Sequence, residues 1–268
     1  MMGGFWKLAA KTGLVSDGSQ PPYGCAWPLK VLSDIKEADA LTDEHFEQAM
    51  ALVNDKEWEI VAFKDPEEGG DMHLWSKPQI GRYHHVKITM SLQNTDPQSV
   101  IDFALSEDLS TRKEFSADIQ KLEVLAKTEK TSLQHQVFSA PSPVAGRDFV
   151  FLCAQKELEG GAIIAYGCSV DSPKVPEESV PVRGATLFAW HVTPVGDHVM
   201  VNYVNCFDPR GWTPAFLLAW LKSAATQEFV NIRAVLSGKK AKVEQLKLEE
   251  CGVSKDELKA ELEQAKTA

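Results

Sequence analysis

Hydrophobic and polar residues alternate along most of the chain between residues 58 and 207. The alternation is clearest in RYHHVKITMSL, residues 82–92, where apolar side chains occupy every second position from Val86 to Leu92. A period of two predicts a strand with one buried face. The pattern predicts about nine strands in all, the other eight lying at residues 58–65, 71–78, 119–129, 131–138, 147–158, 162–170, 182–194 and 198–207.

Short turns with glycine separate several neighbouring strands. Gly69-Gly70, Gly160-Gly161 and Gly196-Asp197 are the clearest of them. Parallel pairing would need crossovers of about a dozen residues or more, so short turns predict an antiparallel sheet. Such a sheet must cover one face with another element, and a long apolar helix is expected to do so.

Helical periods flank and interrupt the strands. Thr42 is the expected N-cap of a helix that runs to about Val53 with its apolar residues on one face. Pro97 suits the first position of a short helix in DPQSVIDFAL, residues 96–105.

The last helix of the domain is expected from Pro214 to about Leu236, with Thr213 as its N-cap. It is not a membrane span, because Lys222 breaks an apolar run that would need about 20 residues. Its apolar side chains go most of the way round, whereas a helix on a solid core needs an apolar stripe only a little wider than about 100°. We therefore expect two faces of this helix to be covered.

Composition changes at both ends of the chain. Residues 1–40 are rich in Gly, Pro, Ser and Asp and predict a largely irregular arm, with Phe5, Trp6 and Trp27 as docking points. Residues 41–237 form the predicted domain. Residues 238–268 are rich in Lys and Glu and predict a charged helical tail that is either solvated or binds a protein partner.

Charge and cysteine usage exclude several classes of function. A net charge of −10 argues against a nucleic acid partner, because phosphate binding needs a basic face. The five cysteines are odd in number, widely spaced and form no C-x-x-C pair, so neither a disulfide framework nor a zinc site is expected. The N-terminus has no signal-peptide core, and a cytoplasmic location is expected.

Enzyme motifs are absent from the sequence. His84 and His85 are adjacent in a predicted strand, point to opposite faces and cannot jointly hold a metal ion. The chain has no G-x-S-x-G, no phosphate-binding glycine loop and no H-E-x-x-H. We expect no catalytic residue, no metal and no cofactor.

Several stretches of the chain resemble the START family, the lipid-transfer domains related to the steroidogenic acute regulatory protein. They are RDFVFLCAQ (147–155), CSVDSPKVPEESVPVRG (168–184), the segment from NYVNCF to NIRAVL (202–236), and RKEF (112–115), which resembles an R-x-x-W stretch of that family. The resemblance implies an α+β helix-grip fold of the Bet v 1-like superfamily. In that fold a curved antiparallel sheet of about nine strands wraps a long C-terminal helix and encloses a lipid tunnel.

The resemblance also implies a function. One lipid would be held in the tunnel and exchanged during transient membrane contact inside the cell, with a phospholipid favoured and ceramide or sterol as alternatives. Two other hypotheses remain open. One is an enzyme on the same fold, similar to a thioesterase or cyclase. The other is a lipid-sensing module whose tail from Lys239 binds a partner.

Candidate ligand-binding residues follow from the resemblance. Arg112 corresponds to an arginine that contacts lipid phosphate in some relatives, its alternative being a surface arginine at a helix end. Ser116 stands where those relatives have an acid, so a buried ion pair with Arg112 is not expected. Gln134 and Gln136 share one face of a strand and would bind a hydroxyl or amide if that face is inward. Sterol-binding relatives have an arginine where this chain has Cys153, so a charged site for a sterol hydroxyl is not expected.

Aromatic residues complete the candidate set. Tyr203 corresponds to a tyrosine that contacts ceramide in one relative, its alternative being a core aromatic, and Tyr166 is a second candidate from the neighbouring strands. Trp212, Phe216 and Trp220 come from the last helix and the turn before it, where they would roof the lipid. Arg147, Asp148 and Arg183 are expected to form a framework of ion pairs instead.

Overall fold

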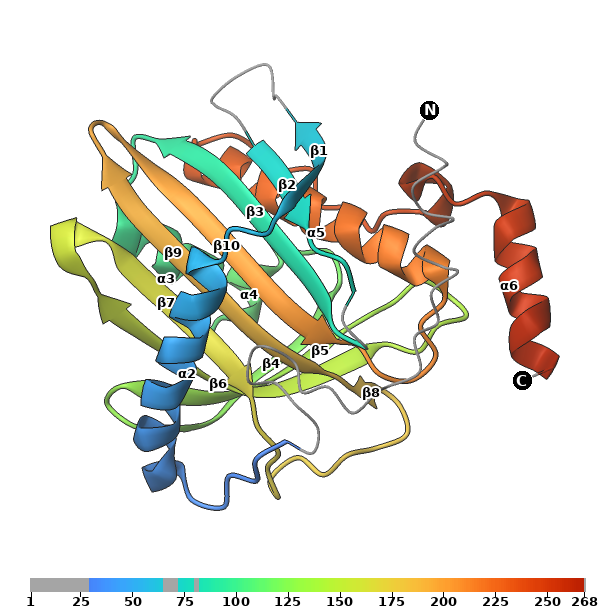
Figure 1. Ribbon diagram of the computed structural model, residues 1–268, viewed down its shortest axis with the longest axis horizontal. Coiled ribbons are helices and arrows are strands. Elements are labelled where there is room, and N and C mark those ends of the chain that lie inside the picture. The colour runs from blue at the N-terminus through green and yellow to red at the C-terminus, as the bar shows by residue number, and fades with distance from the viewer. Residues whose placement is uncertain (1–28, 65–71, 80–81, 268) are drawn as a thin grey trace.

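The computed structural model describes residues 29–64, 72–79 and 82–267 (Figure 1). The predicted docking residues Phe5, Trp6 and Trp27 and the Gly69-Gly70 turn lie outside the described residues.

One curved antiparallel sheet dominates the molecule (Figure 1). Its strands are β1 (Glu59–Lys64), β2 (Met72–Ser76), β3 (His84–Gln93), β4 (Ile119–Lys127), β5 (Thr131–Phe138), β6 (Arg147–Glu157), β7 (Ile163–Ser169), β9 (Ala185–Val195) and β10 (His198–Asp208), with the two-residue β8 (Val182–Arg183). Their order is β1-β2-β3-β10-β9-β7-β6-β5-β4, and β8 adds a short parallel pairing to β6. All nine predicted strands are present.

Helices cover both faces of the sheet (Figure 1). They are α2 (Ala38–Asn54), α3 (Pro97–Ala104), α4 (Leu109–Arg112), α5 (Ala215–Leu236) and α6 (Lys255–Thr267), with 3-10 turns η1 (Ile35–Glu37), η2 (Glu159–Gly161) and η3 (Leu248–Cys251). Leu52 of α2 is buried on one face, whereas Ile101 of α3 and Phe229 of α5 are buried on the other. The α+β helix-grip architecture predicted from the sequence is confirmed.

The predicted strand at residues 182–194 is divided at Gly184. A Cβ atom at this position would lie 2.5 Å from the Phe149 ring and 3.2 Å from the backbone oxygen of Asp208. Real Cβ atoms do not approach other atoms so closely, so the chain needs glycine where it passes from β8 to β9. The turns at Gly160-Gly161 and at Gly196 have positive φ angles, as their glycines predict.

The prediction that Thr42 is the N-cap of the first helix is wrong. α2 begins at Ala38, and Thr42 is buried within it, where its hydroxyl donates to the Asp39 carbonyl at 2.9 Å. The preceding segment is also more ordered than the irregular arm predicted for residues 1–40. Leu32 is buried and its N–H donates to the Asp171 carbonyl at 2.8 Å, which ties the chain to the sheet before α2 starts.

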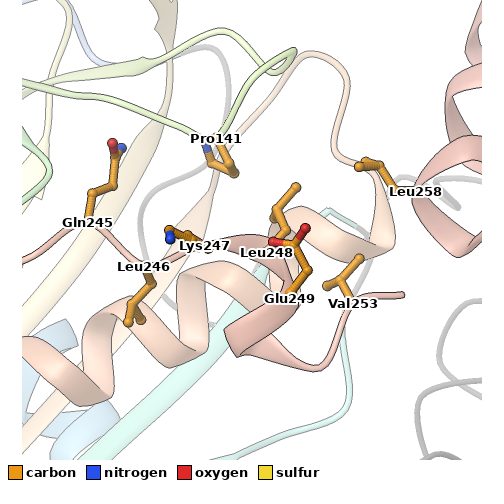
Figure 2. A pocket seen from close by; sticks show the side chains of 8 residues that line it. All are labelled: Pro141, Gln245, Leu246, Lys247, Leu248, Glu249, Val253 and Leu258. Atoms are coloured by element: carbon orange, nitrogen blue, oxygen red, sulfur yellow. The ribbon is translucent and has the colours of Figure 1, made fainter. Parts of the chain in front are cut away.

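The prediction of a solvated C-terminal tail is wrong for the segment that follows α5. Trp220 is only 2% exposed, and it packs in one cluster with Val253 and Leu246. Figure 2 shows Leu248, Val253 and Leu258 around a groove of about 250 Å³ against Pro141. Further along, Ser254 and Glu257 exchange hydrogen bonds at the start of α6 and so form a capping box.

Two faces of α5 are therefore covered, as its apolar surface predicts: one by the sheet and the other by the chain that follows it. No helix among residues 29–64, 72–79 and 82–267 is long and apolar enough to cross a bilayer.

Candidate functional site

Apolar and aromatic side chains pack between the sheet and α5. Strand alternation turns Trp190 of β9 and Tyr203 of β10 toward α5, where Phe229 meets them. The Trp190 and Phe229 rings stack with centroids 4.8 Å apart, and the Tyr203 ring lies 5.0 Å from each of them. This face of the sheet combines a large apolar area with one phenol group.

Arg112 lies under α5. Asp108 caps the short helix α4 by accepting from the N–H groups of Ser110 and Thr111, and Arg112 is its last residue. Arg112 is 7% exposed, and its guanidinium carbon lies 5.4 Å from the centroid of the Phe115 ring. Burial lowers the pKa of Arg112, while Glu228 opposes that shift. The alternative of a surface arginine is therefore wrong.

Glu228 of α5 is the functional candidate that sequence reasoning missed. The Ser116 hydroxyl donates to its Oε2 atom at 3.1 Å. Burial raises the pKa of Glu228, and the nearby charge of Arg112 counteracts this effect. Ser116 gives no reason to expect an ion pair with Arg112, but Glu228 of α5 lies near enough for its charge to oppose the pKa shift of Arg112. The available signal was that Glu228, next to Phe229, is the one acidic residue in residues 215–236.

Tyr203 and Cys153 border the same cluster. The Asn205 amide donates to the Tyr203 hydroxyl at 2.9 Å. Burial raises the pKa of Tyr203, with a further contribution from Glu228, and burial raises the pKa of Cys153 to about 12. Both side chains nevertheless remain partly accessible.

The glutamines of β5 face α5. Gln134 pairs with Phe151 and Gln136 with Phe149, and directly paired residues of antiparallel strands share a face. Phe151 belongs to the cluster beneath α5, so both amides are on the inward face. The Gln136 amide donates to Gln134 Oε1 at 3.1 Å, and Gln134 donates to the Ser132 hydroxyl at 2.8 Å.

Gly167 of β7 lets the Phe188 ring of β9 lie close to the β7 backbone. A Cβ atom at Gly167 would lie 2.5 Å from the Phe188 ring, so the ring occupies the space that a larger residue would need.

Tyr166, a candidate from the sequence, lies on the other face of the sheet from the remaining strand candidates. It pairs with Ala189 on the face of the sheet that packs against α2, and its ring lies 5.7 Å from that of Phe46. Strand alternation points it away from α5, on the opposite side from Ala165.

The three aromatic residues expected to roof the interior lie elsewhere. Phe216 and Trp220 belong to the cluster formed with the segment after α5, and Trp220 donates its indole N–H to the Leu246 carbonyl at 3.1 Å. Trp212 precedes α5, is 40% exposed, and meets the Phe216 ring edge-on at 6.0 Å. Phe216 and Trp220 thus pack against the segment that follows α5 instead of the interior that they were expected to roof.

The expected ionic framework is present on the α2 side of the sheet, with one change. Asp148 accepts from Arg183 at 2.9 Å and lies 3.0 Å from His135 Nε2. Arg147 instead donates to backbone carbonyls, among them those of Pro209 at 2.6 Å and Trp212 at 2.9 Å. Arg147 therefore stabilises the turn before α5 instead of pairing with Asp148.

Solved structures with the same fold include several lipid-transfer proteins. Human StAR-related lipid transfer protein 5 matches with a TM-score of 0.64 and 18% identity, over 76% of this chain and 99% of its own. Human STARD10 matches with a TM-score of 0.58 and 15% identity, over 84% and 96%. A STAR-related lipid transfer protein fragment from Xanthomonas axonopodis matches with a TM-score of 0.56 and 21% identity, over 68% and 99%.

A search of curated proteins gave no match. The sequence model of the START domain, in contrast, matches residues 39–241, which is most of the chain and includes every candidate site residue. Sequence and fold thus agree, and the chain belongs to the START domain family.

Proposed function

We propose that this protein binds one lipid in the apolar interior between the sheet and α5 and transfers it between membranes without chemical change. Membership of the START family supports lipid binding in general. Transfer is further supported by the names of two structural neighbours, which describe lipid transfer proteins.

Enclosure of the lipid tails is the physical basis of the proposal. Two acyl chains of ~16 carbons, at ~0.8 kcal/mol for each CH₂ removed from water, hold a lipid out of solution by ~25 kcal/mol. A carrier must therefore surround the tails and exchange them while it touches a membrane. Phe151, Phe188 and Trp190 supply an apolar wall for this purpose.

The observation that carries the proposal is the polar cluster beneath α5. Cys153, Tyr203 and Glu228 remain partly accessible, although burial is the largest cause of the pKa shift of each. A side chain that lies deep in the protein and still keeps some accessible surface is expected to border an internal space. A lipid head group in that space would meet a few convergent polar groups in an apolar site.

A phospholipid is the favoured ligand. Arg112 is buried, and its Nε atom has no hydrogen-bond partner among the described residues. A guanidinium group binds phosphate with two parallel hydrogen bonds, which are about twice as strong as neutral ones. Ceramide and sterol are the alternatives, since Gln134 and Gln136 offer amides on the same face of the sheet to a hydroxyl or amide group.

Native mass spectrometry of protein purified from cells, followed by extraction of the bound lipid, tests the binding. We expect one phospholipid per chain with its mass unchanged. Transfer of fluorescent phospholipid, ceramide and sterol between vesicles tests the exchange, with an equally acidic protein of unrelated fold as control. Transfer no faster than with the control for all three lipids would overturn the proposal, and conversion of the lipid would favour the enzyme hypothesis.

A further inference from the structure

Arg112 and Glu228 come from different elements and lie near enough beneath α5 for each charge to oppose the pKa shift of the other. Arg112 ends α4, and Glu228 lies in the middle of α5. The Asn231 amide of α5 donates to the Phe115 carbonyl at 3.0 Å, and Ser116 donates to Glu228 at 3.1 Å. These two bonds hold the middle of α5 against the segment that follows Arg112.

The charges of this cluster limit which head groups fit. Arg112 and Glu228 are electrically neutral as a pair, whereas an anionic head group would add a charge with no partner inside the protein. An unpaired buried charge is strongly destabilising. The Ser116 hydroxyl donates to one oxygen of Glu228 and, together with the charge of Arg112, opposes the rise in the pKa of Glu228 that burial causes. Ionised Glu228 would repel a phosphate bound at Arg112.

We infer that Glu228 determines the specificity of the interior for electroneutral lipid head groups that present an N–H or O–H donor. The acceptor oxygens of the head group face Arg112, and its donor faces the Glu228 carboxylate. This inference rests on the proposed function, and it adds a requirement that an arginine alone would not impose. An arginine without Glu228 would favour anionic phospholipids.

A series of lipids with identical acyl chains tests the donor requirement on the unaltered protein. Phosphatidylethanolamine, its N-methyl and N,N-dimethyl derivatives and phosphatidylcholine keep the same charge, while the head group goes from about three N–H donors to none. We expect the amount bound from vesicles to change little until the last donor is lost, and then to fall about tenfold or more, as for a hydrogen bond to a charged group. Equal binding of phosphatidylcholine and phosphatidylethanolamine would refute the donor requirement.

Glu228→Gln tests the residue itself. It removes the charge and retains the side-chain size. We expect the preference for phosphatidylethanolamine over phosphatidylglycerol to fall at least about fivefold relative to the unaltered protein. The reason is that phosphatidylglycerol binding improves when the charge of Glu228 no longer repels the anionic head group. Glu114→Gln is the matched control, because Glu114 is an exposed acid two residues from Arg112 and its loss changes the net charge equally.

The outcomes separate this inference from the proposed function. An unaltered protein that loads lipid but takes phosphatidylglycerol as readily as phosphatidylethanolamine would overturn the inference and leave lipid binding intact. The same conclusion would follow if Glu228→Gln and Glu114→Gln had equal effects on the preference. An unaltered protein that loads none of these lipids, nor ceramide or sterol, would refute the proposed function instead.

Discussion

Trp220 of α5 donates its indole N–H to the backbone carbonyl of Leu246 at 3.1 Å. This bond joins the last helix of the START domain to a segment beyond residue 241, where the match to the family model ends. Glu261 of α6 lies near the start of α5, because the backbone N–H groups of Ala215 and Phe216 oppose the rise in its pKa that burial causes. Pro214 provides no side-chain cap, so a carboxylate near the first turn of α5 is favourably placed.

Truncation after Ala241 is therefore expected to destabilise the domain. The deletion removes Leu246, Leu248 and Val253 from the cluster that covers Trp220. Exposure of this apolar surface should cost at least about 3 kcal/mol of unfolding free energy, measured by urea denaturation. Truncation after Ser254 is the matched control, because it keeps these three residues and should lose less. Equal stability of the full chain and the shorter truncation would show that the segment after α5 is dispensable.

Trp220→Ala is expected to lower stability without a selective effect on any lipid. Replacement of a buried tryptophan by alanine costs about 3–5 kcal/mol, because it removes apolar contacts and leaves a cavity. Thermal unfolding and lipid loading below the unfolding transition check both parts. Selective loss of one lipid class by the folded variant would instead indicate that Trp220 touches the ligand.

Much of the sheet could be predicted because local alternation determines which side chains are buried. Val86 to Leu92 and the glycines at 160, 161 and 196 specify strands and turns with little help from distant residues. The start of α2 could not be located in this way. Asp34 caps a 3-10 turn that leads directly into the helix, so Thr42 lies in its interior although its residue type suits a cap.

The candidate site was harder to predict, since its contacts join distant parts of the chain. Ser116 and Glu228 are 112 positions apart, and no local pattern brings them together. Apolar residues around α5 correctly indicate that two faces are covered. Periodicity does not say what covers each face, and the side of Phe216 and Trp220 packs against the protein's own C-terminal segment.

His45 gives the domain a pH-dependent stability. Burial in α2 lowers its pKa to about 4, and its Nδ1 has no partner among the described residues. The unfolded chain binds a proton at about pH 6.5, whereas the folded chain does not until about pH 4. The contribution of His45 to stability is therefore expected to be fully present above pH 6.5 and to be lost as the pH drops toward 4, by up to about 3 kcal/mol.

His45→Gln should reduce this dependence. Urea midpoints measured from pH 4 to 7.5 are expected to vary less with pH in the variant than in the unaltered protein. His198→Gln at the partly exposed β9–β10 turn is the control and should keep the original slope. A slope for His45→Gln equal to that of the control would show that His45 is protonated in the folded protein.

Arg112→Ala separates a head-group contact from a structural role. The variant loses the charged hydrogen bonds proposed for the phosphate, which are worth about 1.5–3 kcal/mol, so phospholipid loading should fall about 10- to 100-fold. Ceramide and sterol loading should change little. Glu228 loses its favourable neighbour, so its pKa should rise further and the variant should also be less stable.

Lys113→Ala provides the control for charge. Lys113 is exposed, follows Arg112 directly and carries the same charge, so its loss alters attraction to vesicles equally without touching the interior. Competition between lipids in one vesicle population cancels differences in membrane contact, because every lipid is taken from the same surface. Parallel losses of phospholipid, ceramide and sterol in folded Arg112→Ala protein would mean that Arg112 supports the fold, and that the phosphate must be held by other groups.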